Sequence, residues 1–312
     1  MRTQRGFTLV ELLVVVAIIA LLIGVLVPAL SGARKAGYLA SCQSNERQLA
    51  IGLLARASMN NGELCTGAWD NNTKRSAGSL ESKGWIADLV LGEFAKPGEM
   101  LCPTHPAQYS QQLAKPRYSK SPWKSFTDED IRRLIAEGFN TNYCQSWYLA
   151  HTDMINAKAY GDPKWPRFTV GPLTEQRMTR VSASFVPLVS TARTDYTEDP
   201  VQAYGDDRQS VKAMNDGPYF NGSTYVRQDY IDFGPAHGRD AGFVARNSSS
   251  TGRVIGNIVF GDGHVTTIRD TSRDGRFGHD VSSVDGLSTL RYQDEGMNEK
   301  VFGGRLTTGE WF

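Results

Sequence analysis

The chain lacks a surplus of charge of either sign and the short motifs that mark common enzymes. Its 312 residues hold 34 Lys and Arg against 33 Asp and Glu, a net charge of +1, which argues against a nucleic-acid partner held by bulk charge. No Gly-x-Ser-x-Gly elbow, P-loop or dinucleotide fingerprint is present. No Cys-x-x-Cys or His-x-x-x-His pair is present, which argues against a zinc site. The sequence therefore predicts neither catalysis nor nucleic-acid binding.

Apolar residues are distributed unevenly along the chain. Hydrophobic residues make up 40% of it, enough for a real core, and no tandem repeat is visible. The mean hydropathy is nevertheless −0.37, although the first thirty residues are intensely apolar. The sequence therefore describes an apolar segment followed by a larger polar domain.

The apolar segment has the length of a membrane-spanning helix. Residues 12–27 read LLVVVAIIALLIGVLV without a charge, and with their apolar neighbours they reach the roughly 20 residues that a bilayer requires. Basic residues flank both ends, so charge bias leaves the orientation open. A cleaved secretory signal is the alternative, because small residues follow at 31–33. Three features count against that alternative: the length of the run, Glu11 within it, and Pro28 at its far end. A bend in the helix is expected at Pro28.

Glu11 is the informative residue of this segment. An ionised carboxylate in hydrocarbon costs roughly 2.5 to 3.5 kcal/mol on insertion scales, so it is rarely left without a partner. Two explanations stay open on residue chemistry alone: a positively charged partner, or a position near enough to the membrane surface to reach headgroup water.

The segment from Arg5 to Leu13, RGFTLVELL, resembles the leader and helix start of type IV pilins and type II secretion pseudopilins. The resemblance implies that a prepilin peptidase cuts after Gly6 and methylates the new amino terminus at Phe7. It places Glu11 and Pro28 at assembly positions, and gives Glu11 a partner in the amino group of Phe7 on a neighbouring subunit. It also implies a cytoplasmic N-terminus in the inner membrane, an extracytoplasmic head, and a filament in the periplasm or at the cell surface.

The resemblance and the sequence pattern together divide the chain into four parts. Residues 1–6 are the leader, 7–30 a transmembrane and filament helix, 31–61 an amphipathic stalk helix, and 62–312 a head domain. The stalk helix is expected to pack an apolar seam onto the head, with its polar residues on other faces, and to end at Asn60-Asn61-Gly62. The seam is Leu39, Cys42, Leu49 and Leu53, and the polar residues are Gln43, Glu46, Arg47 and Arg56.

The head is expected to be α+β, with an antiparallel sheet against the long helix. A capped helix is predicted from Thr127 to Gly138. Residues 181–193 are β-rich but contain Pro187, which predicts an edge strand or a bulge. Two β-branched runs, 254–260 and 265–268, flank a Gly-Asp-Gly-His turn and predict a hairpin.

This hairpin carries a second resemblance, to pilin-like proteins of planctomycete-type bacteria. Members of that group often have a His followed by nine residues and Asp-Gly. Here 24 residues separate His237 from Asp262, so the sequence departs from that pattern. The turn itself explains Asp262, and a half-exposed strand start explains His264, without a catalytic role.

Four cysteines in an extracytoplasmic head predict disulfides. Spacing does not choose among the three pairings. We favour Cys42 with Cys102, which leaves Cys65 with Cys144; buried free thiols are the alternative.

Calcium is the only cofactor that the sequence brings forward. Carboxylates spaced along a Gly- and Ser-rich stretch suit Ca²⁺, although the EF-hand pattern is absent. Major pseudopilins, which the chain resembles, bind calcium in a carboxyl-terminal loop. The candidate ligands are Asp270, Asp274, Asp280 and Asp285.

The sequence as a whole predicts a non-enzymatic subunit of a type IV pilus-like or type II secretion filament. Its predicted partners are the prepilin peptidase, the membrane and other pilin or pseudopilin subunits. The alternative is a membrane-anchored binding protein or adhesin that uses the leader without polymerising. A third reading, a secreted hydrolase, predicts a mature amino terminus near Arg34.

Overall fold

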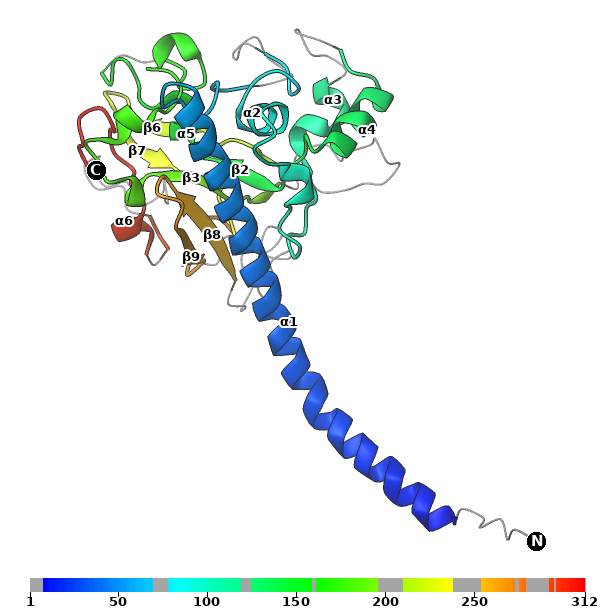
Figure 1. The fold of residues 1–312 in the computed structure, drawn as a ribbon. Coiled ribbons are helices and arrows are strands. Elements are labelled where there is room, and N and C mark those ends of the chain that lie inside the picture. Colours follow the sequence, from blue (N-terminus) through cyan, green and yellow to red (C-terminus); the bar gives the residue numbers. More distant parts are fainter. Residues whose placement is uncertain are drawn as a thin grey trace. The chain divides into compact units, whose positions relative to one another are not determined.

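The architecture is α+β, as the sequence predicts, with one long N-terminal helix followed by short helices and sheets (Figure 1). The computed structural model describes residues 8–69, 78–118, 125–158, 161–195, 210–237, 254–272, 275–278, 292–294 and 296–311. The chain divides into two units, Met1–Ala40 and Ser41–Phe312.

Helix α1 (Leu9–Met59) continues through Pro28 without interruption. It ends where predicted, because Asn61 and Gly62 adopt the left-handed conformation with φ of 54° and 81°. The N–H of Gly62 donates to the carbonyl of Ala57 at 2.8 Å and so satisfies one of the last helical acceptors.

The other helices are short. Helix α4 (Asp128–Glu137) confirms the predicted capped helix. Thr127 and Asp130 form a reciprocal capping box, and Gly138 closes the helix with φ of 101°. The remaining α-helices are α2 (Trp85–Leu91), α3 (Lys115–Tyr118), α5 (Trp147–His151) and α6 (Met297–Lys300). The 3₁₀ turns are η1 (Pro97–Glu99), η2 (Gln111–Leu113), η3 (Pro166–Phe168), η4 (Glu175–Met178) and η5 (Ala183–Phe185).

A four-stranded antiparallel sheet forms the centre of the head. Its order is β2 (Tyr143–Gln145), β3 (Pro187–Thr191), β8 (Ile255–Phe260) and β9 (Val265–Arg269). Strands β8 and β9 are the predicted hairpin. The expectation of an edge strand at Pro187 is wrong, since β3 pairs on both sides, whereas the bulge is found between Pro187 and Val189. Pro187 is tolerated because it is the first residue of its strand.

Two smaller sheets complete the described part of the head. One has the order β1 (Tyr109–Ser110), β5 (Ser210–Val211) and β4 (Thr194–Asp195), and its β1–β5 pair is parallel. The other is the hairpin of β6 (Gly217–Phe220) and β7 (Tyr225–Asp229).

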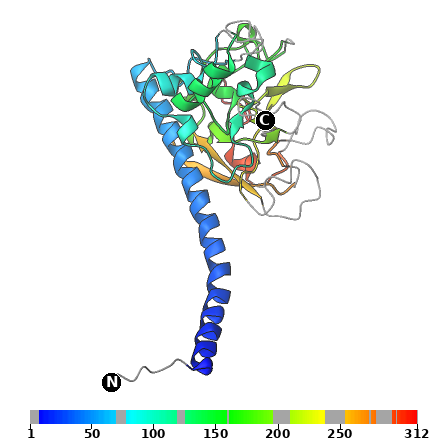
Figure 2. The same ribbon diagram turned by 90° about the vertical axis from the view of Figure 1, so that its right-hand side faces the viewer.

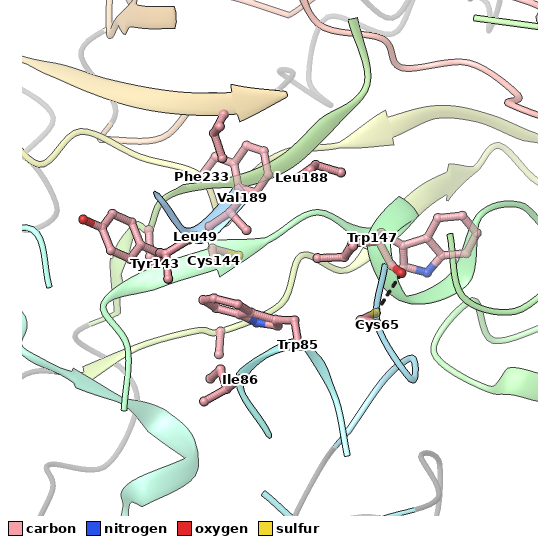
Figure 3. Close-up of a cluster of buried hydrophobic side chains, with 14 of the residues drawn as sticks. Leu49, Cys65, Trp85, Ile86, Tyr143, Cys144, Trp147, Leu188, Val189 and Phe233 are labelled. Atoms are coloured by element: carbon pink, nitrogen blue, oxygen red, sulfur yellow. Dashed lines mark hydrogen bonds between the residues drawn. The ribbon is translucent and has the colours of Figure 1, made fainter. Parts of the chain in front are cut away.

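From residue 41 onward α1 contributes one face to the core of the head (Figures 1 and 2). Leu49 lies with Val189 and Tyr143 in the same cluster of buried side chains (Figure 3). Packing of the seam onto the head is therefore confirmed for Cys42, Leu49 and Leu53, whereas Leu39 is not part of the core. The expectation that Glu46 and Arg56 face elsewhere is wrong, because both lie three or four residues from seam members and are buried with them.

The segment after α6 closes the core from the C-terminal side. Val301, Phe302 and Leu306 are buried, and the Phe302 N–H donates to the Phe185 carbonyl at 2.8 Å. The Trp311 ring meets Phe302 edge-on at 4.9 Å between ring centroids.

Candidate functional site

The helix start that carries the predicted assembly residue is held by a capping box. The backbone N–H and the hydroxyl of Thr8 donate to Oε2 of Glu11 at 2.8 and 2.7 Å, and the Glu11 N–H donates to Thr8 Oγ1 at 3.3 Å. Glu11 is exposed. Gly6 and Phe7, the predicted cleavage and methylation positions, lie outside the described residues.

The sequence analysis missed this capping box, although its signal was present. Thr8 and Glu11 are spaced as Ser/Thr-x-x-Glu immediately before an apolar run. The carboxylate therefore has a local partner within its own chain as well as the one that the resemblance implies. Both bonds from Thr8 use Oε2, which leaves Oε1 free to accept from a further donor.

The apolar side chains of the first half of α1 are exposed, as far as the described residues of the chain extend. The most apolar 18-residue window of this helix has a mean hydropathy of 3.2, and none of it is buried. Among the helices of the described residues, α1 is the one that is long enough and apolar enough to cross a membrane. Each large aliphatic side chain left in water forgoes about 1.5–3 kcal/mol of burial energy. The segment therefore requires lipid or other protein around it.

Pro28 and the small residues near it shape this exposed segment. Proline has no N–H to donate to the carbonyl four residues earlier, so the helix lacks one internal hydrogen bond there. Figure 1 shows residues 9–40 curving rather than breaking. A Cβ added at Gly24, Gly32 or Gly37 would meet no atom within 4 Å. These positions allow another backbone to approach closely.

The four cysteines are all free and buried, so the structure shows neither of the predicted disulfides. Cys65 donates through Sγ to the Leu149 carbonyl at 3.1 Å (Figure 3), and Cys144 donates through Sγ to the carbonyl of Gln145 at 3.6 Å. Cys42 and Cys102 do come together, with His237 beside them.

The structure describes one of the four predicted calcium ligands, Asp270. Asp270 is buried and accepts from the Ser272 hydroxyl at 3.1 Å and the Gly275 N–H at 2.9 Å. Asp274, Asp280 and Asp285 lie outside the described residues, so the calcium site stays a prediction.

The Asp262–His264 pair belongs to the β8–β9 turn. Nδ1 of His264 lies 2.6 Å from Oδ1 of Asp262, and the His264 ring stacks on Phe260 at 4.5 Å. Partial burial raises the pKa of Asp262, but the hydrogen bonds and charge of His264 outweigh burial and leave this pKa below its usual value. The contacts are those of an Asx turn and a ring packed on its strand.

Comparison with known proteins finds similarity at the N-terminus. The family model for the prokaryotic N-terminal methylation motif matches residues 1–27. The type IV wide pilus major component PilA4 of Thermus thermophilus is 63% identical over 35 residues, which are 11% of this chain and 27% of that protein. The chain thus matches about a quarter of the length of this relative. No solved structure matches the chain.

Proposed function

We propose that this type IV pilin-like chain is a structural subunit of a type IV pilus-like or type II secretion filament. A prepilin peptidase would cut after Gly6 and methylate Phe7. The observation that carries the proposal is the coincidence of the methylation motif at residues 1–27 with a helix whose first half exposes its apolar side chains among the described residues. This role divides the chain as the sequence analysis does. The leader is 1–6, the filament helix 7–30, the stalk 31–61 and the head 62–312.

Assembly would bury the exposed half of α1 against equivalent helices. The mature amino group of Phe7 on one subunit would pair with Glu11 on the next. A charge pair in low dielectric adds little net stability but strongly penalises wrong registers. Because Thr8 engages Oε2 and holds the carboxylate in one orientation, Oε1 is presented for that amine.

Membrane insertion precedes assembly in this proposal. The apolar segment has the length to cross the inner membrane once, with the leader in the cytoplasm and the head outside. The motif match supports a membrane-anchored subunit, and the orientation follows from the role of the peptidase.

Mass spectrometry of the native amino-terminal peptide tests the processing step. We expect a peptide that begins at Phe7 and carries one methyl group on its amine. Retention of Met1, or a start near Arg34 as a secreted hydrolase requires, would overturn the proposal.

Cysteine crosslinking in cells separates a filament subunit from a lone membrane-anchored adhesin. Val15 and Ala36 are both exposed on α1, and the native cysteines are buried. A chain carrying Val15→Cys and Ala36→Cys should give a ladder of oligomers. Val15→Cys alone is the matched control, since one reactive cysteine per chain stops at dimers. Monomers from the double variant would show an anchor that does not polymerise.

A further inference from the structure

Two cysteines and a histidine meet inside the head. Cys42 lies on α1, Cys102 follows η1, and His237 follows β7. Their two Sγ atoms and a ring nitrogen all lie within 4.8 Å of one another, and all three residues are buried. Cys102 Sγ is 3.3 Å from His237 Nε2. These are the ligand types that zinc prefers.

The backbone around two of these side chains is fixed by hydrogen bonds. The amide side chain of Asn142 accepts from the Cys102 N–H at 2.9 Å and donates to its carbonyl at 3.0 Å. His237 exchanges two backbone hydrogen bonds with Ile255 at the start of β8, at 2.9 and 2.8 Å. Cys42 is held within the helical ladder of α1. The three groups therefore converge from rigid positions, which favours ligand binding over adventitious proximity.

The contacts of Thr104 fit the tautomer of His237 that can bind a metal. The hydroxyl of Thr104 has one proton, which it donates to the Ala236 carbonyl at 3.1 Å. When the hydroxyl proton lies on that carbonyl, the same oxygen, 2.6 Å from His237 Nδ1, accepts a hydrogen bond from Nδ1–H. Nε2 then carries a lone pair directed at the cysteines. Orientation of a ligating histidine through its other nitrogen is the usual arrangement around protein-bound metals.

An unpartnered acid lies on the same face of α1. Glu46 is four residues after Cys42 and fully buried, and neither carboxylate oxygen accepts a hydrogen bond of ordinary geometry, although the Thr191 backbone N–H faces the group. A buried carboxyl group without a partner is costly. A cation beside it would supply that partner.

We propose that Cys42, Cys102 and His237 bind a zinc ion, and that the Glu46 side chain, one turn of α1 from Cys42 and outside the three-residue cluster of the structure, takes the fourth coordination position in the bound state. Zn–S bonds of about 2.3 Å and Zn–N bonds of about 2.0 Å put tetrahedral ligand atoms about 3.5–3.8 Å apart, close to the spacing found here. Binding releases the two thiol protons and, because burial raises the pKa of Glu46, the proton of that carboxyl group as well, so the occupied site carries one net negative charge. The ion would tie α1 to the segments before α3 and β8. Ligands this far apart in sequence escape any short-spacing rule.

The same two cysteines form the disulfide that the sequence analysis favoured, so the two outcomes exclude each other. Both sulfurs are free in the structure. A disulfide would remove both thiolates and leave His237 Nε2 and Glu46 without the partner that an ion provides. Metal content and thiol count therefore discriminate between the two.

The test uses the full chain, purified in mild detergent without chelator. Elemental analysis should find one zinc per chain, and thiol titration after unfolding in denaturant should find all four cysteines free, since a Cys42–Cys102 disulfide would remove two of them. Exchange with Co²⁺ should produce the thiolate charge-transfer absorption and intense visible bands of a tetrahedral site. Because this cobalt spectrum is measured on the unaltered protein, it does not depend on how variants fold.

Variants then assign the ligands. Cys42→Ser, Cys102→Ser and His237→Gln should each lower zinc affinity at least tenfold, and Glu46→Gln should weaken it measurably. Cys65→Ser is the matched control, since its hydroxyl can still donate to the Leu149 carbonyl, and it should keep the metal. A native Cys42–Cys102 disulfide with no zinc uptake after reduction would overturn the proposal. An unchanged affinity in Glu46→Gln would overturn the assignment of the fourth ligand.

Discussion

His151 should make the head sensitive to acid. Its ring is buried, with Nδ1 3.2 Å from the Thr169 hydroxyl oxygen and Nε2 without a hydrogen-bond partner. Burial, assisted by the positive charge of Lys83, lowers the pKa of His151 to about 3. The unfolded chain exposes the same imidazole to water, where its pKa is about 6.5.

The sign of the effect follows from which state binds the proton. Between about pH 6.5 and pH 3 the unfolded chain is protonated at this residue and the folded chain is not, so acid favours unfolding. The contribution of His151 is fully present above about pH 6.5. It falls by about 1.4 kcal/mol for each pH unit below that, or about 3 kcal/mol over two units.

Urea unfolding of the full chain in detergent measures this effect. Trp147, whose ring centroid lies 5.2 Å from that of His151, provides a fluorescent probe of the site. The free energy of unfolding is compared between the unaltered chain and His151→Phe at about pH 7, 5.5 and 4.5. Carboxyl groups that titrate in this range are common to both proteins, so their contribution cancels in the difference. The stability of the unaltered chain relative to the variant should fall with pH at the slope given above.

The control is His264→Gln, which removes an exposed imidazole at the hairpin turn. Its stability should follow that of the unaltered chain much more closely across the same range. If the curves for the unaltered chain and His151→Phe run parallel, the buried neutral imidazole does not govern acid sensitivity and the reasoning fails.

Three further substitutions test the assembly residue, the core and a helix end. Glu11→Ala should leave membrane insertion and cleavage intact but reduce the sheared filament fraction relative to the membrane-bound pool; normal assembly would remove the proposed role of Glu11. Leu49→Ala should lower the free energy of unfolding by about 2–5 kcal/mol, because Leu49 is fully buried, and a loss below 1 kcal/mol in denaturant titration would contradict its place in the core. Gly138→Ala should cost about 1–2 kcal/mol, since φ is 101° and the added Cβ would lie 3.0 Å from the Lys96 side chain; an unchanged melting temperature would refute this.

The sequence was informative where structure is determined locally. The capped helix at 127–138 and the β8–β9 hairpin carry their own start, stop and turn residues, so both were predictable. The N-terminal motif is equally local. Pro187 shows the limit: a proline suggests an edge, but its position at the first residue of β3 lets a central strand accept it.

Burial and long-range clusters were harder to predict because they depend on what the rest of the chain brings nearby. Polarity alone placed Glu46 on an outer face of the helix, whereas its spacing from Cys42 and Leu49 places it with them. The meeting of Cys42, Cys102 and His237 depends on contacts between residues as far as 195 positions apart, from Cys42 to His237. No local pattern encodes that, and the absence of Cys-x-x-Cys pairs pointed away from it.

The placement of Val301, Phe302 and Leu306 in the core has a consequence for biogenesis. Strands β2, β3 and β8 are synthesised long before these side chains, so part of the interior of the head stays open to water until residue 306 has been translated. The apolar first half of α1, by contrast, is synthesised first and can enter a lipid bilayer before the head is complete. A nascent chain arrested before Met297 should therefore be integrated normally yet remain open to protease throughout residues 62–296, and resistance of that truncated product would show that the head closes without its final segment.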